Sequence, residues 1–182
     1  MSEQTARYQR SMSGMIGALV VTLVAITGFV AWRAVSRDDL AIEPDAVDYL
    51  ASVRYLQDAG ESVVYPPSLP SGWVATSARY RTGRDLGWNL GLLTPDEGFV
   101  GLRQEDASVE QLVGDYIDKD AEEGAPVVLK SPLATSWRSF TDSGGDYGLV
   151  AEVGQETLLV FGSAHPQEIR ELAASLVTTP VR

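Results

Sequence analysis

The chain contains no cysteine and only one histidine in 182 residues. The absence of cysteine excludes thiol catalysis, disulfide cross-links, thiolate-bound metal and processing as a lipoprotein. His165 has no second imidazole to complete a metal site, and it stands directly before a proline, where we expect it to cap the start of a helix. We therefore expect a protein that is not an enzyme, with no catalytic residues, no metal and no cofactor.

Positive charge is also scarce beyond residue 37. Residues 38–182 carry ten basic and twenty-four acidic side chains, a net charge of −14. Without a basic stripe to neutralise phosphates, the sequence argues against nucleic-acid binding and against lying flat on anionic lipid. No glycine-rich phosphate loop occurs at a strand-to-helix junction. Solubility is a sufficient explanation for the acidity.

Charge is missing altogether from residues 15–32, the run MIGALVVTLVAITGFVAW. As a helix with about 1.5 Å rise per residue, this run is roughly 27 Å long, close to the hydrocarbon thickness of a bilayer. It is longer than the apolar core of a signal peptide, and it ends in Trp32-Arg33 rather than in a small-residue cleavage site. The sequence therefore predicts an uncleaved, single-pass transmembrane helix over residues 15–35.

The orientation of this helix is less constrained, because Arg7 and Arg10 precede the run and Arg33 and Arg37 follow it. We expect the short tail, residues 1–14, to stay in the cytoplasm and the C-terminal domain to be extracytoplasmic. Within the helix, one set of small residues would allow close packing against a partner helix, although ordinary transmembrane composition explains them equally well. These residues are Gly14, Gly17, Ala18, Ala25 and Gly28.

Residues 36–62 are expected to form a charged stalk and a juxtamembrane helix. Pro44 suits the first turn of this helix, an apolar ridge follows at Val47, Leu50, Val53 and Leu56, and Gly60 suits its end. The next segment, residues 65–72 (YPPSLPSG), is too rich in proline for a helix or a central strand and is expected to be extended.

Residues 63–182 are expected to form one extracytoplasmic domain. Short aromatic and β-branched runs predict strands over residues 73–80, 87–93, 98–104, 127–130, 134–140, 147–153 and 157–162. Turn residues at 84–85, 95–98, 142–145 and 154–155 separate them. Helices are predicted over residues 108–121, opened by Ser108 and Gln111 at capping-box spacing, and over residues 165–177. This order, three strands and a helix roughly twice, predicts an α+β domain with a mainly antiparallel sheet and two βββα-like halves.

Three segments of the domain resemble a known family. They are residues 69–73 (LPSGW), Thr76-Ser77 and residues 88–95 (WNLGLLTP). In this order and spacing they resemble the DUF4245 group, single-pass actinobacterial proteins of unknown function. The resemblance implies a cell-envelope protein with its domain outside the membrane, and it supplies no catalytic residues. The order of elements is also similar to the Mog1/PsbP type of α/β/α sandwich, at the level of fold alone.

Aromatic and arginine side chains are the candidate site residues. Trp73, Trp88 and Trp137 carry much of the large apolar surface, and at strand spacing such residues more often form a core than a ligand platform. If the domain has a pocket, we expect these tryptophans with Arg103 or Arg138 to line it. They form the predicted ligand or partner surface.

Two motifs resemble functional loops but are better explained otherwise. Asp142-Ser143-Gly144-Gly145 is similar to a serine-protease nucleophile loop, yet the sole histidine lies downstream of it, so a turn between strands is expected. Asp118, Asp120 and Glu122 resemble the start of a calcium loop, which requires glycine at its sixth position and glutamate at its twelfth. Glu123 and Leu129 occupy these positions, so we expect this acidic run, with Asp115, to form the solvated side of a helix.

The leading hypothesis is a membrane-anchored extracytoplasmic binding module, an accessory subunit that contacts a membrane-protein partner. A second hypothesis is the capture of a lipid or small apolar molecule between sheet and helix. A third, a hydrolase, requires carboxylates such as Glu105, Asp106 and Glu152 to converge in space.

Overall fold

The computed structural model describes residues 12–35, 45–82 and 87–181. The chain divides into two compact units, Met1–Glu43 and Pro44–Arg182, and each is described by itself. The first contains helix α1 (Met12–Val35), whose apolar side chains from Met15 to Val30 are exposed. Thr22 and Thr27 donate their hydroxyls to the carbonyls of Ala18 and Leu23 within this helix. Among the described residues, no helix has both the length and the apolar character needed to cross a membrane.

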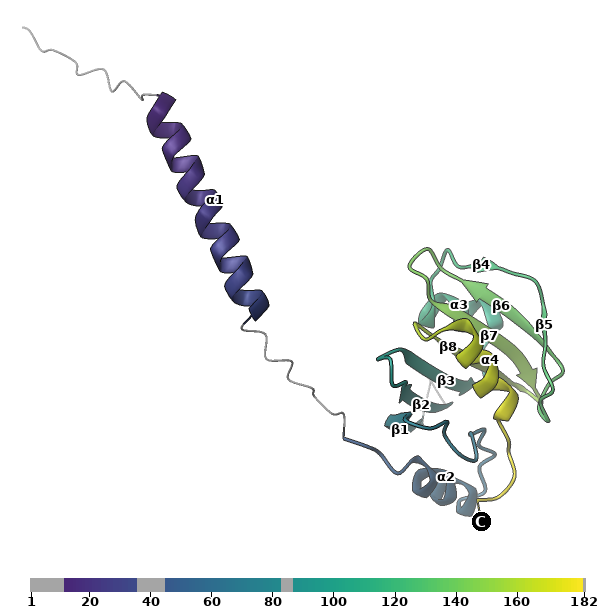
Figure 1. The fold of residues 1–182 in the computed structure, drawn as a ribbon. Coiled ribbons are helices and arrows are strands. Elements are labelled where there is room, and N and C mark those ends of the chain that lie inside the picture. The colour runs from purple at the N-terminus through teal and green to yellow at the C-terminus, as the bar shows by residue number, and fades with distance from the viewer. Residues whose placement is uncertain (1–11, 36–44, 83–86, 182) are drawn as a thin grey trace, which may run out of the picture. The chain divides into compact units, whose positions relative to one another are not determined.

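One antiparallel sheet organises the second unit (Figure 1). Strands β1 (Val74–Arg81), β2 (Gly87–Leu93) and β3 (Phe99–Glu105) form one meander. Strands β6 (Ser136–Thr141), β7 (Tyr147–Val153) and β8 (Glu156–Gly162) form another. The last strands of the two meanders, β3 and β8, pair with each other. Two short strands, β4 (Glu122–Glu123) and β5 (Val127–Val128), pair with β6 at the far edge.

The α+β class with a mainly antiparallel sheet is thus confirmed. Local turn chemistry explains why the two hairpins of the second meander form where expected. Gly154 has φ +69° at the first position of the two-residue β7–β8 loop, a conformation that glycine adopts without steric cost. In the β6–β7 turn the Asp142 carboxylate accepts the Asp146 N–H at 2.8 Å, so the predicted turn at 142–145 is confirmed. The turn expected at 84–85 lies outside the described residues.

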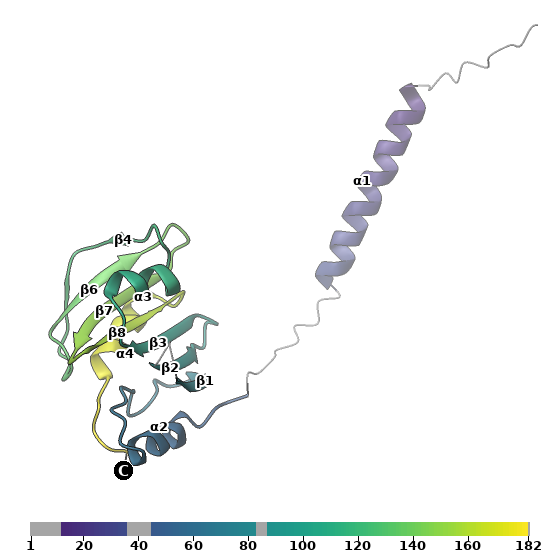
Figure 2. The same cartoon turned by 180° about the vertical axis from the view of Figure 1, so that it is seen from behind.

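Helices cover both faces of the sheet, as the two opposite views show (Figures 1 and 2). Helices α2 (Tyr49–Asp58) and α4 (Pro166–Ser175) pack on one face and bury the main core. Helix α3 (Val109–Tyr116) packs on the other face, over β6, β7 and β8, and buries a smaller core. Since α3 and α4 follow corresponding strands but lie on opposite faces, the two expected halves share their order of elements without being copies in space.

Helix α2 begins later than expected, but Gly60 marks its end as predicted. Its N-cap is Asp48, whose carboxylate accepts the Ala51 N–H at 3.0 Å, and Pro44 lies outside the described residues. At its end, the N–H groups of Gly60 and Glu61 donate to the carbonyls of Gln57 and Leu56, and Gly60 has φ +90°, the pattern of a Schellman motif. Because Val53 and Leu56 are buried in the main core, α2 belongs to the sheet unit, which begins before residue 63.

Helix α3 is shorter than expected. Ser108 caps its start by accepting the Gln111 N–H at 3.2 Å, but the helix ends at Tyr116 instead of continuing to Ala121. The Asp118 carboxylate accepts the N–H of Asp120, a local turn that competes with helix. Glu122 and Glu123 then extend to pair with β6. The expected helix face is therefore wrong for Asp118, Asp120, Glu122 and Glu123, and only Asp115 lies on α3.

Helix α4 begins at its expected cap. His165 accepts the Gln167 N–H through Nδ1, and the Glu168 carboxylate accepts the His165 N–H at 3.0 Å, completing a capping box. The residues expected to be buried, Ile169, Leu172, Ala173 and Leu176, all lie in the main core. The helix ends at Ser175, and Val177 instead exchanges backbone hydrogen bonds with Tyr65.

Candidate functional site

The predicted site residues lie on two different faces of the sheet. Trp88 and Trp137 are fully buried in the main core, and Trp73 packs against that core while half-buried. Arg103 and Arg138 lie on the opposite face, where their guanidinium groups stack on aromatic rings of the smaller core. The structure therefore does not bring the tryptophans and the arginines together in one pocket.

One predicted residue, Trp88, lines an apolar groove of about 580 Å³ between α2 and the β1–β2 hairpin. We call this the α2–β2 groove. Its volume lies in the range of small-molecule sites. It is lined by Ala51, Ser52, Tyr55, Leu56, Ala78, Tyr80, Thr82 and Trp88.

The polar atoms of this groove are few. The indole N–H of Trp88 is buried and has no hydrogen-bond partner among the described residues, whereas that of Trp137 donates to the Ala134 carbonyl at 3.0 Å. Burial, and then the nearby carboxylates of Glu61 and Glu156, raise the pKa of Tyr80. The Tyr80 phenol therefore remains a neutral hydrogen-bonding group at physiological pH. The groove combines an apolar wall with an indole donor and a phenol.

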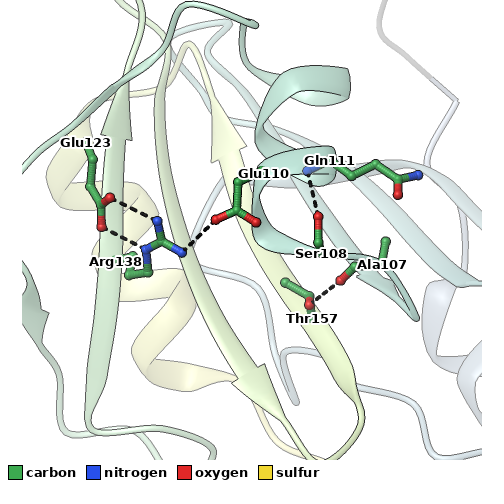
Figure 3. A network of polar contacts seen from close by, with 7 residues as sticks. All are labelled: Ala107, Ser108, Glu110, Gln111, Glu123, Arg138 and Thr157. Carbon is green, nitrogen blue, oxygen red and sulfur yellow. Dashed lines mark hydrogen bonds and ion pairs between the residues drawn. The ribbon is translucent and has the colours of Figure 1, made fainter.

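Arg138 is the centre of an exposed ion-pair network on the other face (Figure 3). Its Nε and one terminal nitrogen bind the two oxygens of Glu123 at 2.7 and 2.9 Å, and its other terminal nitrogen lies 3.4 Å from Glu110. The pKa of both carboxyl groups lies below the ordinary glutamate value. For Glu123 the main cause is the hydrogen bond from Arg138, and for Glu110 it is a hydrogen bond from its own backbone N–H, followed by the one from Arg138. The network ties β4 and the start of α3 to β6.

A recess of about 490 Å³ lies beside this network, and two of the three carboxylates expected for a hydrolase line it. Asp106 and Glu152 belong to the recess, but Glu105 does not. The Glu105 carboxylate instead accepts the Tyr116 hydroxyl at 2.7 Å. No group of three potential metal ligands occurs among the described residues. The arrangement thus gives no assembled set of catalytic carboxylates in the described part of the chain.

Arg103 is held differently from Arg138. Its guanidinium lies 4.7 Å from the centre of the Tyr116 ring and 5.5 Å from that of Phe161, and burial lowers its pKa. Its Nε is buried without a partner among the described residues, as is Oδ1 of Asn89, the residue directly opposite it on β2. Asn89 was not among the residues predicted from the sequence, because only the strand register identifies it as the neighbour of Arg103.

The small residues expected to pack in a membrane lie along α1. Nothing lies within 4 Å of a side-chain carbon built at Gly17 or Gly28, and Ala18 and Ala25 are exposed. The surroundings of Gly14 lie outside the described residues. At about 100° per residue, these positions share one stripe of the helix.

Comparison of the chain with curated proteins gives no match. A family model described as "Protein of unknown function (DUF4245)" matches residues 7–176, which include α1 and nearly all of the sheet domain. The chain therefore belongs to the DUF4245 family.

Proposed function

We propose that this protein is a membrane-anchored extracytoplasmic binding module, an accessory subunit of a membrane or envelope protein complex. One observation supports this most directly. Every large apolar side chain from Met15 to Trp32 whose exposure is described is at least half exposed, between 52% and 69%. An exposed apolar surface of this size is unfavourable in water, and lipid or a protein partner is needed to cover it.

Membrane attachment is tested with the full chain expressed in a cell that carries out membrane insertion. We expect it to sediment with membranes, to resist alkaline carbonate, and to expose its C-terminal domain to protease only from the outer side. The Leu19→Arg/Ile26→Arg variant places two charges in the run and should move the protein to the carbonate supernatant. Extraction of the unaltered protein by carbonate would contradict the anchor, and cleavage from the cytoplasmic side would reverse the orientation.

The accessory role is tested by purification in a mild detergent. We expect a defined partner to co-purify, and Gly17→Leu/Gly28→Leu to release it by filling the small-residue stripe. Ile26→Phe/Val30→Leu enlarges side chains on the opposite side of α1 and serves as the control. A chain that runs only as a monomer with no partner would count against this role.

A second candidate function, binding of a lipid or small apolar molecule, is favoured by the α2–β2 groove. The unpartnered indole N–H of Trp88 is suited to a ligand carbonyl, such as that of an acyl ester, at the side of an apolar wall. Native mass spectrometry after gentle extraction should then show an adduct that Trp88→Phe removes. Trp137→Phe is the matched control, since its indole N–H is already paired within the core. An adduct absent from the unaltered protein, or equally strong in both variants, would exclude this function.

A further inference from the structure

The face of β1, β2 and β3 that is turned away from the main core carries an unusual concentration of positive charge. Of the eight basic residues that the structure describes in the Pro44–Arg182 unit, Arg79, Arg81 and Arg103 lie on this one face. Arg79 and Arg81 are exposed. The strand register places one carboxylate among them, that of Glu105, and this carboxylate accepts a hydrogen bond from the Tyr116 hydroxyl. In a unit that carries ten basic and twenty-one acidic side chains, a net charge of −11, this face attracts negative charge.

In the described part of the unit a helix reaches this face only at β3, where Tyr116 of α3 stacks on Arg103 and donates to Glu105. The buried side chains of α3 pack over β6, β7 and β8, while α2 and α4 pack on the other side of the sheet. Phe99 is 37% exposed here, and its ring meets that of Phe161 edge-on at 6.0 Å. Exposed aromatic rings beside fixed arginines are the composition of protein interfaces. We call the surface formed by Arg79, Arg81, Asn89, Phe99 and Arg103 the arginine face.

Its centre holds a buried donor and a buried acceptor that lack partners. Asn89 is only 8% exposed, and its Oδ1 has no hydrogen bond among the described residues. Arg103, directly opposite, has an unpaired buried Nε–H. A carboxylate or phosphate supplies acceptors alone and would satisfy only Arg103. A peptide group offers both an N–H and a C=O, and would satisfy both residues.

We propose that the arginine face binds an acidic polypeptide segment of a partner protein. A peptide group of the segment meets Asn89 and Arg103, and its carboxylates pair with the exposed Arg79 and Arg81. These arginines are two residues apart on one strand, about 7 Å, which matches alternate side chains of an extended segment. This inference rests on the proposed binding role and names the chemistry of the partner.

The test uses the full chain in a non-ionic detergent and a fluorescein-labelled peptide of four Glu-Ala repeats, with anisotropy as the readout. We expect salt-sensitive binding that Arg79→Gln/Arg81→Gln weakens about tenfold. Both side chains are exposed, so this variant should keep its unfolding temperature. Arg54→Gln removes an exposed charge from α2 and should leave the affinity unchanged. A matching Lys-Ala peptide should not bind.

Asn89→Leu separates peptide recognition from simple charge attraction. It removes the unpaired acceptor, so we expect weaker peptide binding, about fivefold, without loss of stability. Equal weakening by Arg54→Gln, or no effect of Asn89→Leu, would overturn the proposal. The proposal would also be overturned if the protein bound vesicles containing phosphatidylglycerol, or inorganic phosphate, and did not bind the peptide. If the peptide binds but no partner co-purifies, the accessory role is wrong and the binding at the arginine face stands. If Arg79→Gln/Arg81→Gln keeps its partner, the arginine face is not the binding site and the accessory role stands.

Discussion

Gln104 connects three segments that are distant in sequence. Its amide oxygen accepts the Val64 N–H at 2.7 Å, and its amide nitrogen donates to the Ser62 carbonyl at 2.7 Å and to Glu156 at 2.6 Å. Gln104→Leu would leave the buried Val64 N–H and the Ser62 carbonyl without partners. We expect a loss of about 2–4 kcal/mol in the free energy of unfolding, measured by urea denaturation.

The matched control for this substitution is Gln111→Leu. Gln111 is exposed on α3, and its side chain points away from the Arg138 network (Figure 3). The same chemical change there should alter stability by no more than about 0.5 kcal/mol. Equal stability of the two variants would show that the Gln104 hydrogen bonds contribute nothing to the fold.

The Arg138 network makes a pH-dependent contribution to stability. Because the folded-state pKa of Glu123 and of Glu110 is lowered from about 4.5, their contribution is present above that pH and is lost as the pH falls through the lowered values. We expect Arg138→Met to reduce the melting temperature slightly at pH 7. The difference from the unaltered protein should shrink below about pH 4.5 and in high salt. A difference that persists at pH 2 would assign the effect to packing on Phe140.

At the level of elements, local patterns predicted most of what forms. Short runs of aromatic and branched residues predicted β2 and β7 with the observed bounds, and the cap residues predicted the starts of α3 and α4. The end of α3 was not predictable in this way. It depends on Glu122 and Glu123 pairing with β6, and the register of that pairing is set by contacts distant in sequence.

The Ser108 cap gives a prediction for one element. Ser108→Ala removes the only side-chain acceptor for the Gln111 N–H and should destabilise the short helix α3 by about 1 kcal/mol. Hydrogen exchange should accelerate most in residues 109–116, because these lose the cap directly. Ser108→Asp restores an acceptor and should return both exchange and stability toward the unaltered values. Uniform acceleration over the whole sheet would instead show that α3 does not open by itself.

The candidate site shows the same division between local and distant information. The sequence identified Trp88 and Arg103 as residues of interest, but it placed them in a shared pocket. Alternation along a strand assigns a side chain to one of two faces, and only the strand order decides what meets it there. The β1–β2–β3 register alone places Asn89 opposite Arg103 and Arg79 opposite Asn89.

Taken as a whole molecule, the chain joins an exposed apolar helix to a sheet domain with its own two cores. This division leaves the second unit large enough to be stable by itself. About 140 residues bury enough apolar surface for independent stability. The division also separates the proposed roles, with membrane attachment and helix packing in α1 and recognition of an acidic segment on the sheet.

A fragment of residues 44–182 tests this independence. Because both cores lie within the Pro44–Arg182 unit, we expect the fragment to unfold cooperatively, with a melting temperature within about 2 °C of the full chain in the same detergent. It should be recovered without detergent, since the exposed apolar residues of α1 are gone. The control, the same fragment with Leu102→Ala, loses a fully buried side chain and should be less stable by about 2–5 kcal/mol. If the unaltered fragment loses as much stability as this control, residues before Pro44 hold the domain together, and the anchor is part of its fold.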